Sequence, residues 1–141
     1  MAPGELQNLS RSGVLKREPG EQREFDGLVA AGISALNDAQ VAGLSDEGRF
    51  QRAYDAAHAF SLAALRWHGF RPDNKRYAVF LALSHTLGVR PETVRILGEC
   101  HRRRNLAEYE GAFEVDERFL KELLQVAKDL LQSVRKLGPV A

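Results

Sequence analysis

Apolar residues recur at steps of three and four along most of this chain, a spacing that predicts amphipathic α-helices. The last stretch is the most regular, because its leucines form one broad apolar face from residue 119 to residue 137. No segment of useful length alternates between apolar and polar residues with the period of a strand. The pattern therefore predicts an all-α fold, an antiparallel up-and-down bundle of four to five helices. We expect helices over about residues 21–36, 45–67, 77–87, 91–109 and 119–137.

Residues that favour helix ends support several of these boundaries. Ser45 precedes two acidic residues, which suits an N-cap followed by an acidic first turn. Pro91 suits the first turn of the fourth helix, and Gly111 suits its C-terminal stop. Glycines and prolines interrupt residues 1–20, which we expect to form either a short helix or a mobile tail, while residues 21–141 form the helical domain.

Composition and charge exclude several classes of protein. A length of 141 residues suits one domain with its own core, and the net charge of +1 gives no global attraction to nucleic acid or anionic lipid. The single cysteine, Cys100, cannot form an internal disulfide, and the N-terminal residues lack the apolar core of a signal peptide. No apolar run is long enough to span a bilayer. We therefore expect a cytoplasmic protein without a membrane segment.

The fourth predicted helix contains a break in the apolar pattern. At about 100° per residue, one face begins with two aliphatic residues and continues with polar ones: Val94, Leu97, His101, Arg104, Asn105 and Glu108. Two interpretations are open. The polar residues form the exposed end of the helix, where arginines interact favourably with the helix dipole, or they point into a cleft or a subunit interface.

The same segment is locally basic. Five arginines lie between residues 90 and 104, against Glu92 and Glu99, which gives a local charge of +3 that suits phosphate binding. Asn105 favours the cleft interpretation, because asparagine is a mediocre helix former and can hydrogen-bond a neighbouring group. We therefore take five residues as candidate binding residues: His101, Arg103, Arg104, Asn105 and Tyr109.

No catalytic residue, metal site or cofactor is predicted. The histidines lack the spacing of metal ligands, and the glycines form no phosphate-binding loop. His58 and His85 could each face a cleft, but a lone histidine on a packed helix is more often structural. Tyr54 and Asp55 could reach the segment around Arg104, or could be core and surface residues respectively.

The run Arg104-Asn105-Leu-Ala-Glu-Tyr109 resembles the motif on the penultimate helix of HEPN domains (higher eukaryotes and prokaryotes nucleotide-binding). The segment Phe50-Gln-Arg-Ala-Tyr54-Asp-Ala-Ala57-His58, with Ala63-Ala-Leu65 and Gly69-Phe70-Arg71 after it, is similar to the second helix of that family and the loop that follows. The closing leucine-rich helix also matches. The resemblance covers residues 21–137, nearly the whole chain.

This resemblance implies a helical bundle that is commonly a homodimer through a face including the Arg-Asn helix. In active members an arginine and a histidine that follows it cut RNA without a metal, whereas other members bind a small nucleotidyltransferase or act as interaction modules. In this chain no histidine follows Arg104, and Tyr109 takes the matching place. A phenol is a poor general base at neutral pH, so we expect ribonuclease activity to be weak or absent.

We therefore expect a HEPN-like protein, non-catalytic or weakly active, that acts through a protein or nucleic-acid partner, as in toxin–antitoxin or defence systems. The partners implied are a second copy of the chain, a nucleotidyltransferase-type protein and RNA. One alternative is a metal-independent ribonuclease that uses Arg104 and Asn105, with His101 substituting for the missing histidine. Another is a dimerising helical module that binds an acidic partner and no nucleic acid.

Overall fold

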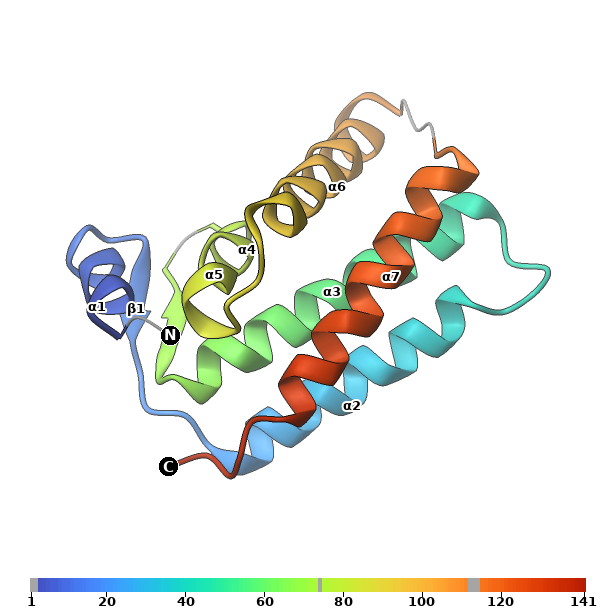
Figure 1. The fold of residues 1–141 in the computed structure, drawn as a ribbon. Helices are drawn as coiled ribbons and strands as arrows, with labels where there is room; N and C mark the ends of the chain where they lie inside the picture. The colour runs from blue at the N-terminus through green and yellow to red at the C-terminus, as the bar shows by residue number, and fades with distance from the viewer. Residues whose placement is uncertain (1–2, 74, 112–114) are drawn as a thin grey trace.

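The computed structural model describes residues 3–73, 75–111 and 115–141 of the chain. It contains four long helices: α2 (Gln22–Ala39), α3 (Asp46–Trp67), α6 (Pro91–Glu110) and α7 (Glu117–Arg135). The shorter elements are α1 (Pro3–Arg11), α4 (Ala78–Leu81), α5 (Leu83–Thr86) and the strands β1 (Leu15–Arg17) and β2 (Phe70–Pro72). The predicted all-α fold is confirmed (Figure 1). Among the described residues, no helix combines the length and the apolar character needed to cross a membrane.

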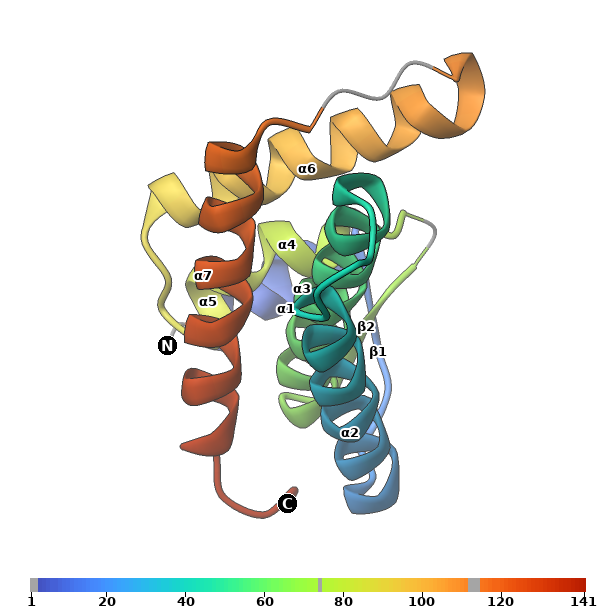
Figure 2. The same cartoon turned by 90° about the vertical axis from the view of Figure 1, so that its right-hand side faces the viewer.

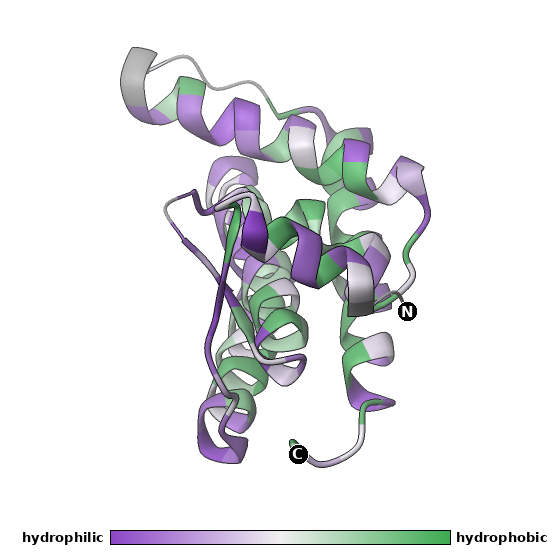
Figure 3. Ribbon diagram, turned by 90° about the vertical axis from the view of Figure 1, so that its left-hand side faces the viewer, coloured by the Kyte–Doolittle hydropathy of each residue, from purple (hydrophilic) through white to green (hydrophobic). Residues whose placement is uncertain are grey.

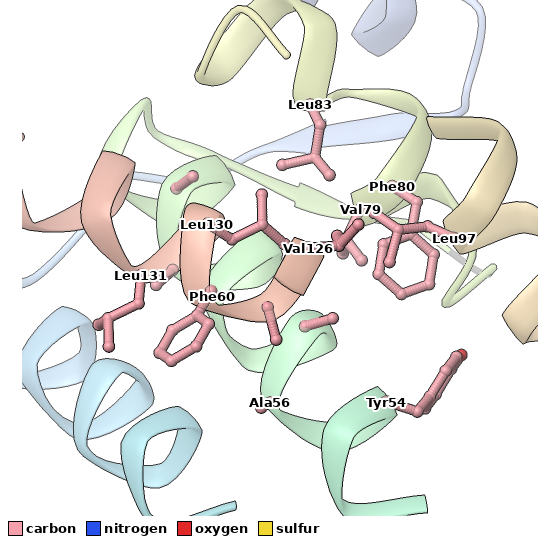
Figure 4. Packing of buried hydrophobic residues seen from close by; sticks show 14 of the residues in the cluster. Tyr54, Ala56, Phe60, Val79, Phe80, Leu83, Leu97, Val126, Leu130 and Leu131 are labelled. Carbon is pink, nitrogen blue, oxygen red and sulfur yellow. The ribbon is translucent and has the colours of Figure 1, made fainter. Parts of the chain in front are cut away.

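The centre of the bundle is formed by α2, α3 and α7, which lie side by side, with α2 running opposite to the other two (Figures 1 and 2). Gly32 of α2 faces the ring of Phe60 on α3, and a side chain at position 32 would clash with that ring. The glycine therefore lets these two helices approach closely. Figure 4 shows Phe60, Phe80 and Leu130 in the same core, although they come from α3, α4 and α7. Burial of each such side chain contributes about 1.5–3 kcal/mol.

The expected helix ends are present. Ser45 caps α3, because its hydroxyl oxygen accepts a hydrogen bond of 3.0 Å from the backbone N–H of Gly48. Pro91 lies in the first turn of α6, and Gly111 ends that helix with a left-handed φ of 67°. Asp116 begins α7 by accepting a hydrogen bond of 2.7 Å from a backbone N–H in the first turn. The predicted boundaries of α3 and α6 are confirmed.

The predicted third helix, residues 77–87, is instead two short helices, α4 and α5, that meet at Ala82. The ψ angle of Ala82 is −12°, which departs from that of a regular α-helix. Ala78, Val79, Phe80, Ala82 and Leu83 are all buried, and on one straight helix they would span about 200° of its circumference, which is wider than a single apolar face. The break at Ala82 allows apolar side chains to be buried on several sides.

The two strands were not predicted, because three residues are too few to show a period. They pair antiparallel, with Lys16 opposite Arg71. The N-terminal residues are part of the core, since the exposed fractions of Leu6 in α1 and Leu15 in β1 are only 1% and 2%. The side chain of Arg66, on α3, joins this N-terminal region to the bundle.

Helix α6 lies across the bundle rather than along it. Figure 2 shows it crossing steeply above the starts of α3 and α7, with its last turns extending beyond them. Leu97 and Cys100 are fully buried and anchor its first half, and Arg103 lies 3.9 Å above the ring of Phe119 on α7. Figure 3 shows many hydrophilic residues farther along the helix, in agreement with the predicted change from aliphatic to polar side chains. This crossing places the polar half of α6 over α3 and the start of α4.

Candidate functional site

Polar and aromatic side chains gather where α6 crosses α3 and the start of α4. Pairs of residues one helical turn apart supply most of them, because such residues share a helix face. We call this group the Arg104 cluster. It consists of Tyr54 and His58 of α3, Arg76 and Tyr77 just before α4, and His101, Arg104 and Asn105 of α6.

The imidazole of His101 is held on three sides. Its Nδ1 lies 3.1 Å from the hydroxyl of Tyr54, and its Nε2 lies 3.2 Å from Nδ2 of Asn105. The ring of Tyr77 stacks on it, with 5.0 Å between ring centroids and 22° between planes. These contacts fix both the position and the orientation of the ring.

The hydrogen bonds also assign the proton of His101. The amide nitrogen of Asn105 can only donate, so Nε2 of His101 accepts and Nδ1 carries the hydrogen. Nδ1 therefore donates to the oxygen of Tyr54. Burial, together with the charges of Arg104 and Arg76, lowers the pKa of His101. The imidazole is neutral at pH 7, and both of its nitrogens are engaged.

Arg104 is partly shielded from water and has an unused hydrogen-bond donor. Its side chain is 22% exposed, and its guanidinium carbon lies 5.2 Å from the centre of the Tyr54 ring. Nη1 is 3.7 Å from a carboxylate oxygen of Glu108, whose side chain is 56% exposed, so this ion pair is weak. Nε is buried and has no hydrogen-bond partner among the described residues.

A second cation lies on the same aromatic ring. The guanidinium carbon of Arg76 is 5.8 Å from the ring centre of Tyr54, and Arg76 itself is exposed. Tyr54 is fully buried, and this burial raises the pKa of its hydroxyl in spite of the opposing charges of Arg76 and Arg104. The ring of Tyr54 therefore supports two arginines by cation–π contact.

His58 also belongs to the cluster, although a structural role was the more common expectation for a lone histidine. Its ring stacks near Tyr54, with centroids 6.4 Å apart, and meets Phe80 edge-on at 5.9 Å. Its Nε2 is buried without a hydrogen-bond partner among the described residues. Burial, followed by the charges of Arg76 and Arg104, lowers the pKa of His58 to about 4. His58 is therefore neutral at pH 7.

The three consecutive arginines of α6 have three different environments. Arg102 is exposed and donates a hydrogen bond of 3.1 Å from Nε to Glu99. Arg103 also donates to Glu99, at 3.1 Å, while its guanidinium covers Phe119. Hydrogen bonds from Arg102 and then Arg103 lower the pKa of Glu99 to about 2, despite the opposing effect of desolvation. Only Arg104 faces the cluster, so the structure does not bring the predicted binding residue Arg103 to the site.

The other residues considered from the sequence are not all part of the Arg104 cluster. The side chain of Tyr109 lies outside the described part of the structure, so its predicted place beside Asn105 stays a prediction. Asp55 accepts hydrogen bonds from residues of its own helix and is not in the cluster. Arg76 and Tyr77 were missed by reasoning from the sequence. Arg76 lies in the connection before α4 and Tyr77 at the first residue of the predicted third helix, and nothing in the apolar pattern there indicates that either side chain points toward α6.

The arrangement is suited to binding an anion beside an aromatic surface. Two arginines carry formal positive charge, and the two histidines next to them are neutral at pH 7. Guanidinium groups match the geometry of phosphate oxygens, and aromatic rings stack with nucleobases. Within the described residues, no three His, Cys, Asp or Glu side chains lie close enough together to hold a metal ion.

Comparisons of this chain with known proteins give no match to a protein-family model, to a curated protein or to a solved structure. The resemblance to HEPN domains therefore rests on the sequence motifs alone. Inferences about function depend on the geometry of the Arg104 cluster.

Proposed function

We propose that this chain is a HEPN-like protein that binds RNA through its phosphate groups at the Arg104 cluster and has little or no catalytic activity. The observation that carries the proposal is the guanidinium of Arg104, which is held over the ring of Tyr54 with a buried Nε that has no partner among the described residues. A buried donor without an acceptor costs about 1–3 kcal/mol. A phosphate oxygen that reached Nε, once the side chains that cover it move, would remove this cost.

The surroundings of Arg104 favour a ligand that carries phosphate groups. Arg76 lies over the same ring and is exposed, so a second guanidinium is available to the same anion or to its neighbour along a strand. The one acidic side chain paired with Arg104 among the described residues is the exposed Glu108, which an incoming phosphate can displace at little cost. A strand with repeated phosphates therefore fits this charge distribution better than a neutral ligand does.

Weak or absent catalysis follows from the state of His101. Metal-independent cleavage of RNA needs a group that takes a proton from the attacking hydroxyl and another that gives one to the leaving oxygen. Both nitrogens of His101 are hydrogen-bonded within the protein, to Tyr54 and Asn105. His101 therefore acts as a positioning residue that orients its two neighbours.

One observation favours the ribonuclease alternative. His58 and His101 both have lowered pKa values beside Arg104, but only the neutral imidazole of His58 has a nitrogen that no described residue engages. Nε2 of His58 has no internal partner among the described residues, and it could accept a proton directly. This alternative predicts RNA cleavage that is lost in His101→Ala or His58→Ala and in Arg104→Ala.

The test compares Arg104→Ala with Arg102→Ala, which removes the same charge from an exposed position on the same helix. Binding to a fluorescent single-stranded RNA should weaken at least about tenfold in Arg104→Ala and by less than about twofold in Arg102→Ala. Equal losses in both variants would mean that only net charge matters and would reject the site.

Incubation with RNA should give no cleavage, and cleavage that depends on Arg104 and His101 would establish the ribonuclease instead.

The other partners implied by the resemblance are part of the same proposal. We expect a homodimer, a nucleotidyltransferase-type partner and a role in a toxin–antitoxin or defence system. Sizing the protein in solution tests the dimer. A purely dimerising module would bind an acidic protein with strong dependence on salt and would show no affinity for RNA.

A further inference from the structure

A pocket of about 410 Å³ lies beside the Arg104 cluster, between the turn that follows α1 and the start of α4. Its lining residues include the apolar side chains of Val14, Ala78 and Leu81, the ring of Tyr77 and Lys75. Leu81 is 43% exposed, although the chain buries most of its other large apolar side chains. The volume is within the range of pockets that hold small organic groups.

Tyr77 connects this pocket to the Arg104 cluster. Its side chain lines the pocket, and its ring also stacks on His101 at 5.0 Å between centroids. The hydroxyl of Tyr77 lies against α6 at Gly98, where a Cβ in place of the glycine hydrogen would come within 2.9 Å of the hydroxyl oxygen. A group in the pocket would therefore contact the same tyrosine ring that stacks on His101 of the Arg104 cluster.

The charges around the pocket indicate the kind of group it suits. Among the described residues that line it there is no carboxylate, and Lys75 supplies a cation. Arg76, the next residue, lies over the ring of Tyr54 inside the Arg104 cluster. A pocket with aliphatic and aromatic walls, next to two cations, matches a flat aromatic base attached to a phosphate chain.

We propose that this pocket holds one unstacked nucleobase of a single-stranded RNA whose adjacent phosphate is bound by Arg104 and Arg76. The base lies against Leu81 and Tyr77, and Lys75 contacts the next phosphate of the strand. This inference rests on the proposed function and adds to it the class of substrate, because a base within a duplex cannot enter such a pocket. A protein side chain in the pocket is the competing occupant.

The experiment uses two single-stranded RNA oligonucleotides of equal length, one with all bases and one with an abasic stretch, and measures affinity by fluorescence anisotropy. Leu81→Ala is compared with Leu44→Ala, a leucine of similar exposure (39%) that does not line the pocket. We expect Leu81→Ala to weaken binding of the strand with bases by about fivefold and to leave binding of the abasic strand unchanged. Leu44→Ala should change neither affinity.

The outcomes separate this inference from the proposed function. If Leu81→Ala changes RNA affinity no more than Leu44→Ala does, or lowers the affinity for both strands equally, no base occupies the pocket. Equal affinity of the wild-type protein for the two strands would lead to the same conclusion. Arg104→Ala should weaken both strands, and this loss would keep the proposed function even when the pocket fails. No binding of either strand by the wild-type protein would overturn both.

Discussion

Two arginines of this protein, Arg66 and Arg104, are both shielded from water, yet they differ in how their donors are used. Arg66 is 3% exposed, and each nitrogen of its guanidinium has a partner. Nε donates to Glu24 at 2.8 Å, and Nη1 donates to the backbone oxygen of Glu18 at 2.8 Å. Nη2 donates to the backbone oxygen of Pro19 at 2.9 Å.

Arg104 is only partly buried, but it has fewer partners. The structure shows one distant ion pair with Glu108, a cation–π contact with Tyr54 and no acceptor for Nε among the described residues. The difference separates two uses of the same side chain. The guanidinium of Arg66, whose donors are all satisfied, joins parts of the fold, whereas that of Arg104 has one distant, exposed ion-pair partner and keeps hydrogen-bonding capacity for a ligand. Variants in the surroundings of each arginine can test this distinction.

The largest effect is expected for Arg66→Ala, which removes the side-chain hydrogen bonds that join Glu18 and Pro19 to α3. The unfolding free energy should fall by about 3 kcal/mol, because a carboxylate and several carbonyl groups lose their partner. Urea denaturation measures this loss. The carboxylate of Glu18 lies 3.2 Å from Nη2 of Arg66 and 3.0 Å from Nε of Arg71. Arg71→Ala is therefore the matched control, and because Arg71 is 42% exposed it should cost less than about 1 kcal/mol. Similar losses for the two variants would contradict the role given to Arg66.

The second effect concerns the pH dependence of the Arg104 cluster. The pKa of His58 is lowered to about 4 in the folded protein, mainly by burial and then by the charges of Arg76, Arg104 and His101 that face it. Between pH 6.5 and pH 4 the unfolded chain binds a proton at His58 and the folded chain does not. The unfolding free energy should therefore fall by up to about 2–3 kcal/mol as the pH drops through this window.

The control for this prediction is His58→Gln, which cannot titrate. Carboxylates such as Glu99, whose pKa is about 2, contribute equally to both proteins and cancel in the difference. Urea denaturation at several values between pH 7 and pH 4 should give a shallower slope for the variant. Identical slopes would show that His58 titrates normally and that the cluster is open to water. Such a result would weaken the contrast between Arg104 and Arg66.

The smallest effect on stability is expected for Gly98→Ala, which alters the cluster without removing any of its charges. Alanine is the better helix former, but its Cβ would lie 2.9 Å from the hydroxyl oxygen of Tyr77, which must shift. The net change in unfolding free energy should be below about 1 kcal/mol, while RNA affinity falls about threefold because Tyr77 is displaced. Gly27→Ala, in α2, has open space for its Cβ and should stabilise slightly with no change in affinity. An unchanged affinity in Gly98→Ala would mean that the position of Tyr77 does not matter.

Part of this site could be predicted from sequence because it depends on one helix. The spacing of His101, Arg104 and Asn105 places them on one face of a helix, one turn apart. The apolar residues at the start of that face indicate that it points toward the bundle. Arg103 was included as a neighbour in sequence, but successive residues on a helix point about 100° apart, and its side chain reaches α7 instead. Charge runs alone cannot distinguish these directions.

The remainder depends on how α6 crosses the bundle. Tyr54 and His58 share a face of α3, but nothing in the sequence indicates that α6 passes above that face at a steep angle (Figure 2). Tyr77 lies just before α4 and stacks on His101 of α6, a contact between separate elements that local periodicity does not indicate. The fold class follows from local periodicity, whereas the site follows from tertiary packing, which single-sequence patterns do not contain.

The measurement that tests the account most directly is the effect of Arg104→Ala on unfolding free energy and on RNA affinity in the same preparation. We predict that the unfolding free energy changes by less than about 1 kcal/mol while binding weakens at least about tenfold. A fall of about 2–5 kcal/mol, as for the truncation of a core leucine, with unchanged affinity of the folded protein, would show that Arg104 holds the fold together and would contradict the proposal.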